Sequence, residues 1–228
     1  MVVRLGLLTR KEGVGVPEFR AHWRNVHGAI AAKLPHLRRY CQNAIVDRRQ
    51  RAINYPRSAW DFDGVSQLCF DDLAAMRAAF ASPVVEELAA DETTFIGDVK
   101  LVSAIPHEVI PVSQAGPLIK RMSTLRRKAG VSHDTFMHEW FDVHSVLVKR
   151  LPQVLGYRQN LVVDRSLGRG RPATYEELPI DGVVELWFRD ADSLEQAFGS
   201  PSGRTLMTHA EEFIGEISTF LVDCHEVL

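Results

Sequence analysis

Residues 17–35 are PEFRAHWRNVHGAIAAKLP, and residues 134–152 are DTFMHEWFDVHSVLVKRLP. Both stretches contain Phe-x3-Trp-x3-His followed by Leu-Pro, and the second copy follows the first at a constant offset of 117 positions. Side chains four residues apart lie on neighbouring turns of one helix face. His27 falls at the border of the predicted apolar stripe, so its imidazole should meet the edge of a core. The stripe itself contains Phe19, Trp23, Val26, Ile30 and Leu34.

The repeat extends over nearly the whole chain. After one inserted residue the offset becomes 118, so that Asp63-Gly64-Val65 matches Asp181-Gly182-Val183. A single insertion across two such lengths indicates a duplication with the same fold in each half. We predict domains at residues 1–110 and 118–228, joined by a linker at residues 111–117. Further identical pairs at the offset of 117 are Lys11/Lys128, Gly13/Gly130, Tyr40/Tyr157, Gln42/Gln159 and Asn43/Asn160.

Each half shows the pattern of a ferredoxin-like unit. One helix is expected at residues 17–34, and a second begins after a capping aspartate, Asp71 or Asp72. The predicted order of elements is therefore β-α-β-β-α-β. Apolar runs predict strands of the first half at residues 2–9, 37–47, 64–70 and 95–109.

The composition is that of an ordinary globular protein, with 46% hydrophobic and 25% charged residues among 228. The formal net charge of −2 argues against a general nucleic-acid binder, which is usually basic. Three cysteines without paired spacing favour free thiols in a reducing compartment. Because neither an apolar run of about 18 residues nor a secretory signal is visible, we expect a cytoplasmic protein without a membrane span.

The combination Lys-x-Gly-Val, Phe-x3-Trp-x3-His, Leu-Pro and Tyr-x-Gln-Asn resembles the EthD family of the dimeric α+β barrel superfamily, and both halves carry it. The resemblance implies an α+β fold with a four-stranded antiparallel sheet and two helices on one face of each unit. It further implies that two ferredoxin-like units pack sheet to sheet as an intrachain pseudo-dimeric α+β barrel. Relatives in the superfamily include cofactor-free enzymes that act on small aromatic or lactone-type molecules.

His27 and His144 are the candidate catalytic residues. Histidine titrates near neutral pH and can move a proton to or from a carbon acid or an enol. The same position would also suit a core histidine that hydrogen-bonds a backbone carbonyl, and spacing alone leaves both interpretations open. The family resemblance, in which this histidine belongs to the motif, supports the catalytic interpretation.

Other repeated residues could line a pocket beside each histidine. Tyr40 and Gln42 alternate along one strand and therefore share a face. Their hydroxyl and amide could hold an enolate or carbonyl oxygen, although a core tyrosine with a satisfied hydroxyl is an alternative. The candidate substrate-binding residues are Trp23, Tyr40, Gln42, Trp140, Tyr157 and Gln159.

Neither a metal nor another cofactor is expected. The chain lacks zinc-ligand spacing, a Gly-rich phosphate loop and a Gly-x-Ser-x-Gly elbow. Arginines at residues 48–51 and 165–171 could steer an anionic substrate, although solvated loops explain them more simply. Trp187 stands where the first half has Cys69, so a tryptophan could fill one of the two pockets.

The leading hypothesis is a cofactor-independent enzyme of the isomerase, cyclase or lyase type. Its substrate would be a small hydrophobic molecule of aromatic, lactone or polyketide-like character. One alternative is a non-catalytic protein that binds a small hydrophobe or assists a partner enzyme. Another is a cofactor-free monooxygenase of the same superfamily. We expect a monomer with an internal pseudo-dimer, and two such chains could associate further.

Overall fold

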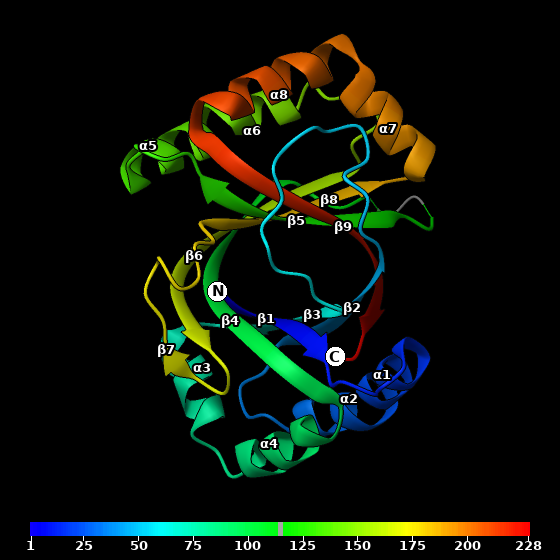
Figure 1. The fold of residues 1–228 in the computed structure, drawn as a ribbon, viewed down its shortest axis with the longest axis vertical. Coiled ribbons are helices and arrows are strands. Elements are labelled where there is room, and N and C mark those ends of the chain that lie inside the picture. Colours follow the sequence, from blue (N-terminus) through cyan, green and yellow to red (C-terminus); the bar gives the residue numbers. More distant parts are fainter. Residues whose placement is uncertain (114–115) are drawn as a thin grey trace.

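The computed structural model describes residues 1–113 and 116–228, and both halves follow the same order of elements (Figure 1). The first half consists of β1 Val2–Arg10, α1 Val16–His22, a π-helical turn Trp23–His27, α2 Gly28–Ala31, β2 Arg39–Asp47, β3 Gly64–Phe70, α3 Leu73–Phe80, α4 Val84–Phe95 and β4 Ile96–Ile110. The second half consists of β5 Ile119–Arg127, α5 His133–His138, a π-helical turn Glu139–His144, α6 Ser145–Val148, β6 Gly156–Leu167, β7 Arg171–Pro172, β8 Gly182–Phe188, α7 Ala191–Gly199, α8 Pro201–Phe213 and β9 Ile214–Glu226.

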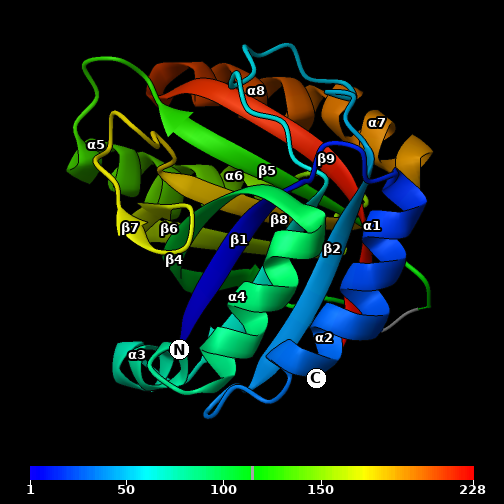
Figure 2. The ribbon, with the colours of Figure 1, turned by 60° about the horizontal axis from the view of Figure 1, so that its bottom comes forward.

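The strands form one closed antiparallel sheet. Their order is β4-β1-β3-β2-β9-β5-β8-β6-β7, and a further pairing of β4 with β6 closes the barrel. The two halves are thus joined twice, by β2 with β9 and by β4 with β6. Figure 1 shows the two sets of helices on opposite outer sides, and Figure 2 shows α1 and α4 crossing the outer face of the first sheet. The fold confirms the expected intrachain α+β barrel.

The domain boundaries stay a prediction. Part of the expected linker, residues 114–115, lies outside the described residues. Within the described residues, no helix combines the length and apolar character needed to cross a membrane.

The first helix differs from the continuous α-helix that the spacing predicts. Residues Trp23–His27 form a π-helical turn, in which the Gly28 N–H donates to the Trp23 carbonyl. The extra residue in this turn rotates the following side chains. Val26, expected in the apolar stripe, is 44% exposed, whereas His27 is only 6% exposed. The prediction for Val26 was wrong, because a regular 3.6-residue period does not anticipate a π-turn.

Two glycines leave room for the repeated tryptophans to pack against the sheet. A Cβ atom at Gly64 would stand 2.4 Å from the Trp23 ring, and one at Gly182 would stand 2.3 Å from the Trp140 ring. Such distances are far below van der Waals contact. The repeated Asp-Gly-Val stretches therefore supply the space that the repeated Phe-x3-Trp motif requires.

We predict that Gly182→Ala lowers the free energy of unfolding by about 1–3 kcal/mol, because the methyl group overpacks the Trp140 ring. Gly199→Ala is the matched control, since nothing lies within 4 Å of a Cβ atom there. Urea unfolding of both variants at neutral pH measures the difference. Equal losses in the two variants would contradict the packing argument.

The barrel interior contains a buried ion pair. Lys120 is 5% exposed, and its Nζ lies 2.5 Å from Oε2 of the fully buried Glu185. Lys120 also donates to Asn43 Oδ1 at 3.0 Å and to Gln67 Oε1 at 3.1 Å. The Gln67 and Asn160 amides each donate to Glu185 Oε1 at 2.9 Å. Burial alone would raise the pKa of Glu185, but the charges of Lys120 and Arg158 and the bonds from Lys120 and Asn160 hold it at about 2.

Replacing only one residue of the Lys120–Glu185 pair should lower the free energy of unfolding more than replacing both. Lys120→Met leaves Glu185 with only the more distant Arg158, whose Nη1 lies 3.8 Å from Glu185 Oε1, and we expect a loss of about 3 kcal/mol in the free energy of unfolding. The double variant Lys120→Val/Glu185→Gln installs the residues that the first half has at these positions, Val3 and Gln67. It should lose less than half as much in urea unfolding at pH 7. A double variant that is less stable than the single one would refute this account.

Candidate functional site

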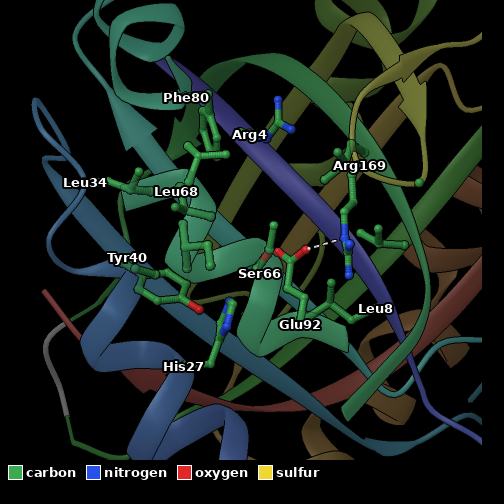
Figure 3. A pocket seen from close by; sticks show the side chains of 17 residues that line it. Arg4, Leu8, His27, Leu34, Tyr40, Ser66, Leu68, Phe80, Glu92 and Arg169 are labelled. Carbon is green, nitrogen blue, oxygen red and sulfur yellow. Dashed lines mark ion pairs between the residues drawn. The ribbon is translucent and has the colours of Figure 1, made fainter. Parts of the chain in front are cut away.

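The first pocket lies between the helices and the sheet of the first half (Figure 3). Its volume is about 100 Å³. A cavity of about 150 Å³ holds benzene, so this pocket has room for the reacting end of a small molecule. Most of its lining is apolar. The polar or charged side chains in the lining are Arg4, His27, Tyr40, Ser66, Glu92 and Arg169.

A carboxylate fixes the orientation of His27. Asp91 Oδ2 lies 2.8 Å from His27 Nδ1, and Asp91 Oδ1 lies 2.7 Å from His22 Nε2. Because a carboxylate only accepts, the hydrogen-bond network assigns the His27 proton to Nδ1. His27 lines the cavity, and no residue in the described ranges hydrogen-bonds its Nε2, so this lone pair is the one available to a ligand. Burial lowers the pKa of His27 despite the opposing effect of Asp91, so the ring is neutral at pH 7.

Tyr40 is held beside the same cavity as a hydrogen-bond donor. Gln42 Nε2 donates to Tyr40 Oη at 3.1 Å and to the Trp23 carbonyl at 2.6 Å. Since Tyr40 Oη accepts this bond, its own proton is available to a ligand. Burial raises the pKa of Tyr40 to about 12, which keeps the phenol protonated. Trp23 and Gln42 lie behind Tyr40 and do not line the cavity, so their place is that of positioning residues.

Arg4 and Arg169 lie on the side of the pocket away from His27, and the Glu92 carboxylate lies between His27 and Arg169 (Figure 3). The Arg4 guanidinium lies 4.1 Å from the centroid of the Phe80 ring. Arg169 Nε lies 3.5 Å from Glu92 Oε2, and their side chains are 50% and 26% exposed. The Arg169–Glu92 pair thus lies where the cavity meets solvent.

Each pocket is completed by a loop from the other half. Arg169 belongs to the second half, where it follows β6, yet it lines the first pocket. In return, Ile53 from the long loop between β2 and β3 lines the second pocket. Gln50 Nε2 anchors that loop by donating to the Ile217 carbonyl at 2.8 Å. Arg169, for which the sequence left a solvated loop and the steering of an anion as alternatives, is half-exposed and also lines the first pocket.

The second pocket occupies the equivalent place but is smaller, at about 40 Å³. His144, Tyr157 and Trp140 line it, and Gln159 donates to the Trp140 carbonyl at 2.7 Å. Larger side chains account for the lost volume. They are Val148 in place of Ala31, Val184 in place of Ser66 and Met207 in place of Ala89.

In the second pocket a different set of hydrogen-bonded side chains orients the histidine, His144, and it also leaves the Nε2 lone pair available. Glu139 Oε2 lies 3.0 Å from His209 Nε2, and His209 Nδ1 lies 3.2 Å from His144 Nδ1. His209 donates from Nε2 to the carboxylate, so its Nδ1 accepts and His144 donates from Nδ1. The Nε2 lone pair of His144 is again the free one. The histidine and the carboxylate that orient the ring have exchanged positions between the halves. His22 corresponds to Glu139, and Asp91 corresponds to His209.

Trp187 does not fill either histidine pocket. It lines a third cavity of about 400 Å³ inside the barrel, together with Lys120 and Glu185. Cys69 likewise belongs to the hydrophobic cluster of the barrel interior. The expectation that this pair of positions distinguishes the two pockets was wrong, because alternate strand residues face opposite sides of the sheet.

Comparison with known proteins assigns the family. The family model named EthD domain matches residues 11–98 and 128–216, which together make up more than half of the chain. The chain belongs to the EthD family. No relative was found among the curated proteins.

Solved structures resemble this EthD protein over nearly its full length. An anthrone oxidase-like protein shares a TM-score of 0.66 and 8% identity, covering 99% of this chain and 93% of that chain. A candidate monooxygenase from Lactobacillus acidophilus NCFM has a TM-score of 0.57 and 10% identity, with coverage of 98% and 93%. A dye-decolorizing peroxidase from Bacteroides thetaiotaomicron VPI-5482 has a TM-score of 0.53 and 8% identity, with coverage of 97% and 92%. At such identities these likenesses establish a shared fold alone.

Several site residues of the EthD protein escaped the sequence reasoning. Asp91 and His209 were missed because these equivalent positions are not identical in the two halves. The signal in the sequence is that a histidine and a carboxylate swap places at both pairs of positions, His22/Glu139 and Asp91/His209. Arg4 was missed although Arg121 repeats it at the offset of 117. Among residues 1–113 and 116–228, no cluster of three potential ligands is arranged to hold a metal ion.

The buried second histidine should make the protein acid-sensitive. Burial, with a smaller contribution from His209, lowers the pKa of His144 from 6.5 to about 3. Between these values the unfolded chain binds the extra proton, so stability falls as pH drops below about 6.5, by at most about 1.4 kcal/mol per unit. We predict that from pH 7 to pH 5 the wild type loses about 2 kcal/mol more than His144→Gln.

Urea unfolding at both pH values tests this difference. His138→Gln serves as the control, because the His138 side chain is 63% exposed. Its pH dependence should follow that of the wild type. If His144→Gln also follows the wild type, His144 does not carry the acid sensitivity.

Proposed function

We propose that the first half is the active site of a cofactor-independent proton-transfer enzyme of the isomerase, cyclase or lyase type. The observation that carries this proposal is the Asp91–His27 pair, whose free Nε2 lies at a cavity. The neutral ring is a base at pH 7, and its partner stabilises the imidazolium that forms when it accepts a proton. The substrate would be a small aromatic, lactone or polyketide-like molecule with an ionisable carbonyl.

The proposed step begins with His27 Nε2 taking a proton from a carbon next to the carbonyl group. The electron pair of the broken C–H bond moves onto the carbonyl oxygen, which becomes an enolate. The Tyr40 hydroxyl donates to this oxygen, as hydrogen-bond donors do at developing oxyanions. The protonated His27 then returns the proton to a second carbon or to a leaving group, which completes isomerisation or elimination.

Deuterium exchange tests the first step without knowledge of the natural substrate. The probes are a five-membered unsaturated lactone and a small cyclic monoketone in D₂O, and proton NMR follows the loss of the protons next to the carbonyl group. General base catalysis contributes about 10²–10⁴-fold, so His27→Gln should reduce exchange by at least about 10²-fold. His144→Gln is the matched control in the other half and should keep wild-type exchange.

Asp91→Asn should give an exchange rate between those of the wild type and His27→Gln. The Asn amide can donate to His27 Nδ1 and thereby favour the tautomer that carries its proton on Nε2. It should slow exchange by about 10-fold or more while His27 remains present. Thermal unfolding of each variant shows that the fold is intact. Equal exchange in the wild type and in His27→Gln would remove His27 from the mechanism and leave the non-catalytic binder as the better description.

The monooxygenase alternative draws on the names of two structural neighbours, the candidate monooxygenase and the anthrone oxidase-like protein. Oxygen uptake with an electron-rich phenol separates it from the proton-transfer proposal. Uptake that needs His27, with no deuterium exchange of either carbonyl probe, would favour the oxygenase.

A further inference from the structure

The second pocket contains a buried cation that forms no ion pair with a carboxylate among the described residues. Arg121 is 3% exposed, and its guanidinium lies 4.5 Å from the centroid of the Phe198 ring. Within residues 1–113 and 116–228, its Nε and Nη1 atoms find no hydrogen-bond acceptor. Burial lowers the pKa of Arg121 to about 9, so the group is still charged at neutral pH. Buried charges are stable when they are paired. The Arg121 guanidinium should therefore bind an anion.

The first half shows how the equivalent cation is balanced. Arg4 lies on Phe80 in the same way that Arg121 lies on Phe198. The carboxylates of Glu92 and Asp164 raise the pKa of Arg4 against the larger effect of burial. At the position of Glu92 the second half has Ala210, which is 1% exposed. The second half has therefore kept the cation and lost the carboxylate.

The space beside Arg121 limits what the partner can be. The pocket of about 40 Å³ exceeds the roughly 10–15 Å³ that one water needs and is well below the roughly 150 Å³ of a cavity that holds benzene. Its remaining walls are mostly apolar, and they include Leu125, Leu186 and Leu206. The polar side chains among the remaining walls are Ser123, His144 and Tyr157, and a water bonded to them and to Arg121 would leave the guanidinium charge unbalanced. A monatomic anion instead gains from the guanidinium charge itself.

We propose that the second pocket is a structural binding site for a monatomic anion of the chloride class, held by Arg121. Ser123, which lines the same pocket, can supply a further donor. The anion replaces the carboxylate that Glu92 provides in the first half. This site does not depend on the proposed catalytic role of the first pocket.

Thermal unfolding of the whole protein tests the proposal in potassium chloride and in potassium gluconate at equal ionic strength. Gluconate is too large for the pocket, so chloride should raise the Tm of the wild type by about 3–6 °C. Arg121→Met removes the charge but keeps an unbranched apolar chain over Phe198, and it should lose the chloride shift. Arg4→Met is the matched control in the first half and should keep it.

A second variant covers the case in which Arg121→Met fails to fold. Ala210→Glu restores the carboxylate of the first half next to Arg121, and it should abolish the chloride shift by occupying the anion site. Crystals grown in bromide should show an anomalous peak beside Arg121 Nε or Nη1 in the wild type. Equal Tm values in chloride and gluconate, an undiminished shift in Ala210→Glu, or no bromide peak at Arg121 would each overturn the proposal.

Discussion

The structure depends on the two strand pairings that join its halves. Pairing of β2 with β9 and of β4 with β6 leaves neither four-stranded sheet with a free long edge. The inner faces of the two sheets then meet, and each half covers an apolar surface that the other would expose to water. The same closure brings the loop that carries Ile53 to the second pocket and the loop that carries Arg169 to the first. Neither pocket is complete within its own half.

Covalent joining allows the two halves to differ where a homodimer could not. Lys120 corresponds to Val3, and Glu185 corresponds to Gln67. In a dimer of identical units each lysine would appear twice inside one barrel, at a large desolvation cost. In the single chain one lysine meets one glutamate. The hydrogen-bond partners that orient His27 and His144 also differ, yet in both cases Nε2 is the ring nitrogen left available.

Because the two halves have diverged, the two pockets differ in their capacity to bind a substrate. The first has small residues around a neutral, oriented histidine, and an ion pair at its opening. The second is narrowed by Val148, Met207 and the inserted Ile53, and its arginine has lost the carboxylate. A cavity of about 40 Å³ is too small for an aromatic, lactone or polyketide-like substrate. One copy of the duplicated site is therefore the candidate for chemistry.

The sequence by itself determined the duplication, the order of elements and the positions of His27, His144, Tyr40 and Tyr157, because each is repeated at a constant offset. Periodicity could not determine the π-turn that buries His27 and exposes Val26, since it assumes 3.6 residues per turn. Tertiary structure alone decided which partner orients each histidine, because Asp91 and His209 come from a helix more than 60 residues away in the chain. It also decided that each pocket is completed by the opposite half, since the closed barrel, and no local preference of the chain, brings those segments together.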